Sequence, residues 1–157
     1  MLTRKQGIAG IVITLFVGSG LLYLNPWQSD SPFIDPADQS LVLQGKKIYA
    51  TNCASCHGAN LEGQSNWRQR LPNGRLPAPP HDVTGHTWHH ADSLLIDIVK
   101  NGLIPGRTAP PGYQSDMPAY GSVLSDEEIR AVLAYIKSSW PLQALQAQKD
   151  MTLKQNH

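Results

Sequence analysis

The chain has 157 residues, enough for one folded domain with extensions and too few for two ordinary domains. Its 13 lysines and arginines nearly balance its 12 aspartates and glutamates, so it lacks the basic surplus that binds a phosphate backbone, and no nucleic acid partner is expected. The 12 prolines and 13 glycines predict short helices joined by long loops.

Residues 7–24 form an uncharged apolar run directly after Arg4 and Lys5. At about 1.5 Å rise per residue, a helix of this length nearly spans a hydrocarbon core of ~30 Å, which predicts a transmembrane anchor. The positive-inside tendency then keeps residues 1–6 as a cytoplasmic stub and places the rest of the chain on the periplasmic side. A cleaved signal peptide is the alternative, although no small-residue cleavage site follows Leu24.

Three further segments follow the predicted anchor. Residues 25–39 contain Pro, Ser and Asp without apolar periodicity, which predicts an extended linker. Residues 40–141 are expected to form the folded domain, beginning with a helix over residues 40–52 that leads into a cysteine motif. The tail, residues 142–157, alternates Leu and Ala with Gln and Lys, and we expect at most a frayed helix there with no chemical role.

Two more helices are predicted inside the domain. An apolar stripe over residues 92–101 predicts a short helix that ends at Gly102. A capping box of Ser125 and Glu128 begins the clearest helix, which Pro141 ends. The remaining segments are rich in glycine and proline and are expected to be loops, so the predicted fold class is all-α.

Cys53, Cys56 and His57 form a C-x-x-C-H motif, in which two thiols bond the vinyl groups of a porphyrin and the adjacent imidazole binds its iron. Two residues three positions apart on a helical turn face the same way, as the vinyl edges of one ring require. A zinc site would need further ligands, a structural disulfide leaves the histidine unexplained, and a thioredoxin-like pair needs alternating strands and helices. We therefore expect one covalent haem c.

The iron needs a second axial ligand or keeps an open site, and this choice separates electron transfer from ligand chemistry. Met117 lies in the segment SDMPAYG, and its thioether suits iron in both oxidation states. Pro118 restricts the backbone of Met117, which favours a single approach of the sulfur. Because Met1 is the initiator and Met151 lies in the tail, Met117 is the favoured second ligand.

Four histidines within ten positions are the rival ligands. They are His81, His86, His89 and His90. An imidazole in the second axial position would lower the reduction potential relative to a thioether. The favoured interpretation is that these rings lie at the surface or hold the haem propionates beside Trp88 and Arg75, and the alternative is a second metal site for copper or zinc.

The motifs CASCHG and MPAYG and the helical segment LSDEEIRAVLAYIKSSW occur in this order. On these motifs, the chain from about Asp38 to Trp140 resembles the class I c-type cytochromes, in particular the monohaem, membrane-anchored bacterial type. The resemblance implies an all-α fold of short helices and long loops wrapped around the haem, with the first and last helices of the domain crossing beside it. The residues implied to meet at this crossing are Gly45 and Tyr49 on one helix and Val132 and Tyr135 on the other.

The resemblance also implies thioether bonds at Cys53 and Cys56, with His57 as the proximal and Met117 as the distal ligand of the iron. Electron transfer is the implied activity, so the chain is not expected to be an enzyme or to hold catalytic residues. We expect a one-electron carrier tethered to the membrane in a respiratory chain, with a reductase, a dehydrogenase or a terminal oxidase as partner. The alternatives are a permanent electron-entry subunit of a larger membrane oxidoreductase complex, a gas-binding haem protein and a copper-handling protein.

Overall fold

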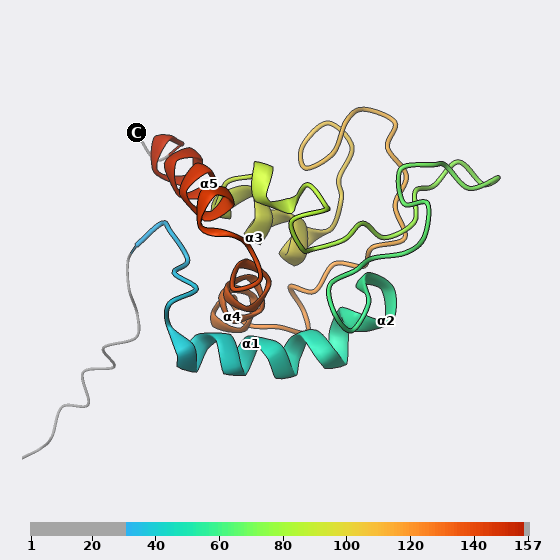
Figure 1. The fold of residues 1–157 in the computed structure, drawn as a ribbon. Coiled ribbons are helices and arrows are strands. Elements are labelled where there is room, and N and C mark those ends of the chain that lie inside the picture. Colours follow the sequence, from blue (N-terminus) through green and yellow to red (C-terminus); the bar gives the residue numbers. More distant parts are fainter. Residues whose placement is uncertain (1–30, 156–157) are drawn as a thin grey trace, which may run out of the picture. The chain divides into compact units, whose positions relative to one another are not determined.

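Figure 1 shows the computed structural model of the chain, which describes residues 31–155. The predicted membrane anchor at residues 7–24 and the cytoplasmic stub at residues 1–6 lie outside the described residues. The described part is helical without a β-strand, which confirms the all-α class for it. None of its helices is long and apolar enough to cross a membrane. The helices are α1 (Gln39–Asn52), α2 (Ala54–His57), the 3-10 helix η1 (Thr87–His89), α3 (Asp92–Asn101), α4 (Asp126–Lys137) and α5 (Leu142–Lys154).

Side-chain caps begin the two principal helices. The Asp38 carboxylate accepts hydrogen bonds from the backbone N–H groups of Ser40 and Leu41 and so starts α1. At α4 the Ser125 hydroxyl accepts from the Glu128 N–H at 3.3 Å, and the Glu128 carboxylate accepts from the Ser125 N–H at 2.8 Å. This is the predicted capping box, which satisfies N–H groups that the first helical turn leaves without partners.

The crossing of α1 and α4 forms the centre of the core. A Cβ at Gly45 would lie 1.9 Å from the Ala131 carbonyl oxygen and 3.0 Å from the Val132 nitrogen, so only glycine permits this approach. One turn along α1, the Tyr49 side chain is only 1% exposed, and its ring centroid lies 5.3 Å from that of Tyr135. The crossing expected from the resemblance is therefore present in the structure.

Replacement of Gly45 by alanine should lower the free energy of unfolding by about 1–3 kcal/mol, because the added methyl group forces α1 and α4 apart. The loss should appear even though alanine favours a helix by about 1 kcal/mol over glycine. Urea unfolding followed by circular dichroism measures it, with the exposed α1 residue Lys46 changed to alanine as the control. Equal stability of Gly45→Ala and the parent would contradict the tight crossing.

The segment after residue 141 differs from the expected frayed tail. Residues Leu142–Lys154 form the helix α5, and the side chains of Gln148 and Thr152 on it are fully buried. The predicted linker also ends earlier than expected, because Ile34 is fully buried and the Ser31 carbonyl accepts a hydrogen bond from Arg130 at 3.1 Å. Both segments therefore pack onto the domain.

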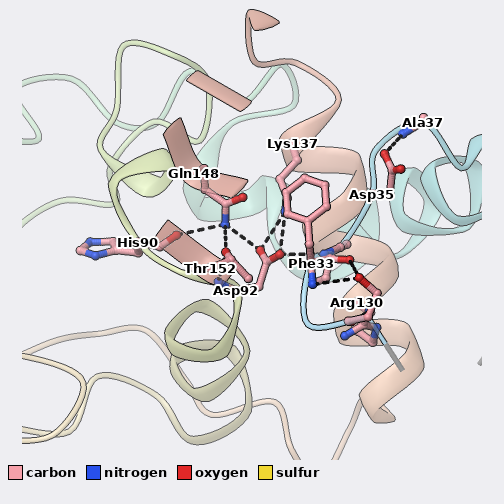
Figure 2. A network of polar contacts seen from close by, with 11 residues as sticks. Phe33, Asp35, Ala37, His90, Asp92, Arg130, Lys137, Gln148 and Thr152 are labelled. Atoms are coloured by element: carbon pink, nitrogen blue, oxygen red, sulfur yellow. Dashed lines mark hydrogen bonds and ion pairs between the residues drawn. The ribbon is translucent and has the colours of Figure 1, made fainter. Parts of the chain in front are cut away.

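A buried polar network holds these two segments to α3 and α4, as Figure 2 shows. The Asp92 carboxylate accepts hydrogen bonds from Lys137 Nζ at 2.8 Å, Gln148 Nε2 at 2.8 Å and the Ile34 N–H at 2.7 Å. The side chains of Asp92 and Lys137 are both fully buried, and the ammonium of Lys137 also lies 3.8 Å from the centre of the Phe33 ring. Burial lowers the pKa of Lys137 to about 8, although the carboxylate of Asp92 opposes this shift.

Candidate haem site

The cysteine motif lies on a single helical turn. Cys53 ends α1 and begins α2, and its carbonyl accepts hydrogen bonds from the N–H groups of Cys56 at 3.2 Å and His57 at 2.9 Å. Cys53 is partly buried and Cys56 is exposed, and the two do not form a disulfide. Before haem is attached, burial raises the pKa of the Cys53 thiol to about 11. The turn thus presents two cysteine sulfurs next to an imidazole.

His57 is held in the tautomer that can bind a metal. Its side chain is largely buried, and its Nδ1 lies 2.8 Å from the Pro79 carbonyl oxygen. Because a carbonyl only accepts, Nδ1 carries the proton and the lone pair is on Nε2. Burial lowers the pKa of His57, which favours the neutral ring that a metal requires. These observations fit a covalent haem with His57 on its iron.

The Pro79 carbonyl belongs to a strap, residues 79–81, that is pressed against the cysteine motif. A Cβ at Gly63 would lie 2.4 Å from the Pro80 nitrogen, and one at Gly85 would lie 2.0 Å from the Pro80 carbonyl oxygen. The Gly63 N–H in turn donates to the His57 carbonyl at 2.8 Å. The sequence predicts only an irregular loop here, and consecutive prolines do not reveal which carbonyl meets His57.

The segment that carries Met117 also contacts the chain next to the cysteine motif. The Tyr120 hydroxyl donates to the Asn52 carbonyl at 2.6 Å, directly before the cysteine motif. The Tyr120 N–H donates to the Val99 carbonyl at 2.9 Å, which ties the segment to α3 as well. Desolvation by burial raises the pKa of Tyr120, so its hydroxyl remains a hydrogen-bond donor.

Met117 itself is partly buried, and its N–H donates to the Ser115 hydroxyl at 3.0 Å. Its neighbour Asp116 forms an ion pair with Arg75, which lies on the loop between α2 and η1. In Figure 1 this loop and the one that carries Met117 lie on the same side of the helical core. The structure therefore brings Cys53, Cys56 and His57 together on one turn and places the segment of Met117 beside that turn.

Three of the four loop histidines make aromatic contacts around η1. The His86 ring stacks on Trp67 at a centroid distance of 5.6 Å and meets His90 edge-on at 5.4 Å, while His89 stacks on Trp88 at 3.7 Å. Burial lowers the pKa values of His86 and His90. Across residues 31–155, no three His, Cys, Asp or Glu side chains are grouped so that they could hold a metal ion. The alternative of a second metal site in this loop stays a prediction.

The residues expected beside the haem propionates have partners within the protein. Arg75 is paired with Asp116, and the Trp88 Nε1 donates to the Val83 carbonyl at 3.3 Å. The fourth histidine, His81, lies apart from the others, because its ring stacks on that of His57 at a centroid distance of 3.8 Å. Sequence reasoning grouped it with the loop histidines, since proximity along the chain was the only signal.

Comparisons with the sequences of known proteins identify the family of this chain. The family model described as cytochrome c matches residues 42–140. The cbb3-type cytochrome c oxidase subunit CcoP of Azospirillum brasilense is 27% identical over 137 residues, covering 83% of this chain and 41% of that protein. The gluconate 2-dehydrogenase cytochrome c subunit of Pantoea cypripedii is 29% identical over 96 residues, covering 61% of this chain and 20% of that protein.

A third relative, the cytochrome bc1 complex cytochrome c subunit of Mycobacterium tuberculosis (strain ATCC 25618 / H37Rv), is 33% identical over 60 residues, covering 38% of this chain and 21% of that protein. The chain thus spans less than half the length of each of these three relatives. No solved structure matches it significantly. The family match over residues 42–140, together with the motif of Cys53, Cys56 and His57 on one turn, shows that the chain belongs to the cytochrome c family, as a class I c-type cytochrome with covalent haem c.

Proposed function

We propose that the chain is a one-electron carrier whose haem is bonded to Cys53 and Cys56 and whose iron is bound by His57 and Met117. The observation that carries the proposal is the hydrogen bond between His57 Nδ1 and the Pro79 carbonyl, which directs the Nε2 lone pair away from the strap. Bound haem supplies an iron that alternates between its ferrous and ferric states. The residues of the chain would hold that iron and fix the orientation of its ligands.

The thioether of Met117 gives this site its proposed character. A sulfur ligand suits both oxidation states and raises the reduction potential relative to a second imidazole. With His57 and Met117 both bound to it, the iron would not readily bind oxygen or peroxide, and the site would transfer electrons without making or breaking a bond of a substrate. The hydrogen bond of Tyr120 to the Asn52 carbonyl supports the placement of Met117 near the cysteine motif, and the exposed ion pair of Asp116 with Arg75 lies on the other side of Met117 in the sequence.

Membrane attachment and partners complete the proposal. The apolar run at residues 7–24 would tether the domain on the periplasmic side, where a tether raises the effective concentration of the carrier at a membrane-bound partner. A reductase, a dehydrogenase or a terminal oxidase would be such a partner. The compared relatives are named as subunits of an oxidase, a dehydrogenase and a cytochrome bc1 complex, which also supports the alternative of a permanent electron-entry subunit.

A potentiometric titration of the full-length holoprotein tests the proposed function. The haem absorbance should follow one reversible one-electron Nernst curve, and carbon monoxide should leave the spectrum of the reduced form unchanged. Rapid formation of a carbon monoxide complex would contradict the filled iron and favour a gas-binding protein. Purification from membranes in mild detergent separates the two electron-transfer roles, since a fixed stoichiometry with other subunits supports the permanent subunit.

A further inference from the structure

His81 makes an unusual contact with the proposed iron ligand. Its ring and that of His57 are stacked with centroids 3.8 Å apart and an angle of 17° between their planes. The Nδ1 of His81 is buried and has no hydrogen-bond partner among residues 31–155. The Nδ1 of His81 thus makes no hydrogen bond within the described part of the chain, and the contact of the side chain with His57 is a packing of the two rings.

The backbone that carries the His81 ring is fixed on both sides. Its N–H donates to the Leu61 carbonyl at 2.8 Å, and its carbonyl accepts from the Trp140 Nε1 at 2.8 Å. Leu61 adopts a φ of 69°, a conformation that leucine rarely takes and that persists only where the surroundings enforce it. The Tyr49 ring also meets His81 edge-on, at a centroid distance of 5.9 Å.

The two contacts on His57 restrict different motions. The hydrogen bond to the Pro79 carbonyl holds one atom, and such bonds tolerate donor angles from linear down to about 150° with little loss. With haem bound, this hydrogen bond alone would still let the imidazole rotate about its bond to the iron. A parallel ring against its face opposes that rotation, because any turn drives one edge of His57 into His81.

We propose that His81 is a positioning residue that sets the rotation of the His57 imidazole about the bond between the iron and Nε2. The inference rests on the proposed function, in which His57 binds the iron. Second contacts that orient a metal ligand tune the metal, and with haem bound the plane of the His57 imidazole would govern how the unpaired electron of the ferric state is distributed over the haem. His81 thereby influences the electronic state of the cofactor without touching the iron.

Two substitutions at His81 show whether the orientation of His57 depends on a flat ring at this position or only on a side chain of similar volume. His81→Phe keeps an aromatic ring against His57, whereas His81→Leu fills similar space without a ring. The control is His90→Leu, because the half-buried His90 ring contacts His86 and not His57. The full chain with attached haem is oxidised, and the haem-methyl resonances in its proton NMR spectrum are compared, since their spread follows the orientation of the axial ligands.

We expect His81→Leu to change the order and spread of the haem-methyl resonances, His81→Phe to restore the parent pattern, and His90→Leu to leave it unchanged. His81→Phe should fold, because it removes a buried nitrogen that lacks a partner. An unchanged pattern in His81→Leu, or a failure of His81→Phe to restore it, would overturn the inference. A parent protein without low-spin haem-methyl resonances would instead contradict the proposed ligation itself.

Discussion

Replacement of Met117 by alanine should leave the iron with His57 as its only protein ligand, so that the reduced protein binds carbon monoxide and its reduction potential falls. The expected fall is on the order of 0.1 V, within the roughly 0.8 V over which axial ligands set haem potentials. The fall follows because a thioether stabilises ferrous iron better than the water that would replace it. Potentiometry and carbon monoxide titration of the full-length holoprotein measure both effects.

The matched control for this substitution is Met151→Ala. Met151 lies on α5 and is partly buried like Met117, so the two changes remove the same side chain at a similar degree of burial. The control should retain the potential of the parent and its resistance to carbon monoxide. If Met117→Ala also retains both properties, another side chain holds the iron, and the histidines around η1 become the first residues to test.

The largest loss of stability is expected when Lys137 is replaced by methionine. The substitution leaves the fully buried carboxylate of Asp92 without its cation, and removal of one partner from a buried ion pair typically reduces the free energy of unfolding by about 3–5 kcal/mol. The effect should spread to α5 and to the segment around Ile34, because both are hydrogen-bonded to the same carboxylate. Denaturant unfolding of the holoprotein, followed by far-ultraviolet circular dichroism, measures the loss.

Two further variants show whether the buried charge is the cause. Asp92→Asn added to Lys137→Met removes the uncompensated charge and should recover a large part of the lost stability. Lys100→Met removes an ion pair with Asp126 whose side chains are 41% and 71% exposed, and it should change the free energy of unfolding by about 1 kcal/mol or less. Equal losses from Lys137→Met and Lys100→Met would contradict a structural role for the buried pair.

The elements that the sequence predicts well are those determined by local chemistry. The capping box of Ser125 and Glu128 is a short-range signal, and α4 begins where it predicts. The turn of Cys53 and Cys56 is equally local, because the spacing of the two thiols is itself the signal. Both features can be recognised without knowledge of which distant residues pack against them.

The elements that differ from the prediction depend on contacts between distant parts of the chain. The helix α5 has weak amphipathic character in its sequence, and its buried Gln148 is stabilised by Asp92, 56 positions earlier. The segment around Ile34 has the composition of a linker, yet its N–H binds the same carboxylate from 58 positions away. Periodicity cannot reveal such pairings, because a buried polar residue resembles a surface residue in sequence.

In the candidate site, too, the local features could be predicted from the sequence and the contacts between distant residues could not. Identification of Cys53, Cys56 and His57 required only the motif, whereas the second contacts of His57 come from the strap at residues 79–81. That strap reaches His57 because Gly63 and Gly85 leave room for Pro80, an arrangement that composition does not reveal. The role inferred for His81 therefore became visible only once the packing of three loop segments was known.

The near-infrared magnetic circular dichroism spectrum of the oxidised full-length protein tests the central claim most directly, because the energy of its charge-transfer band identifies the pair of axial ligands. We predict the band of an imidazole and a thioether on low-spin iron, as ligation by His57 and Met117 requires. The band of two imidazoles would contradict ligation by Met117, and the spectrum of high-spin iron with an open site would contradict the account of the chain as an electron carrier.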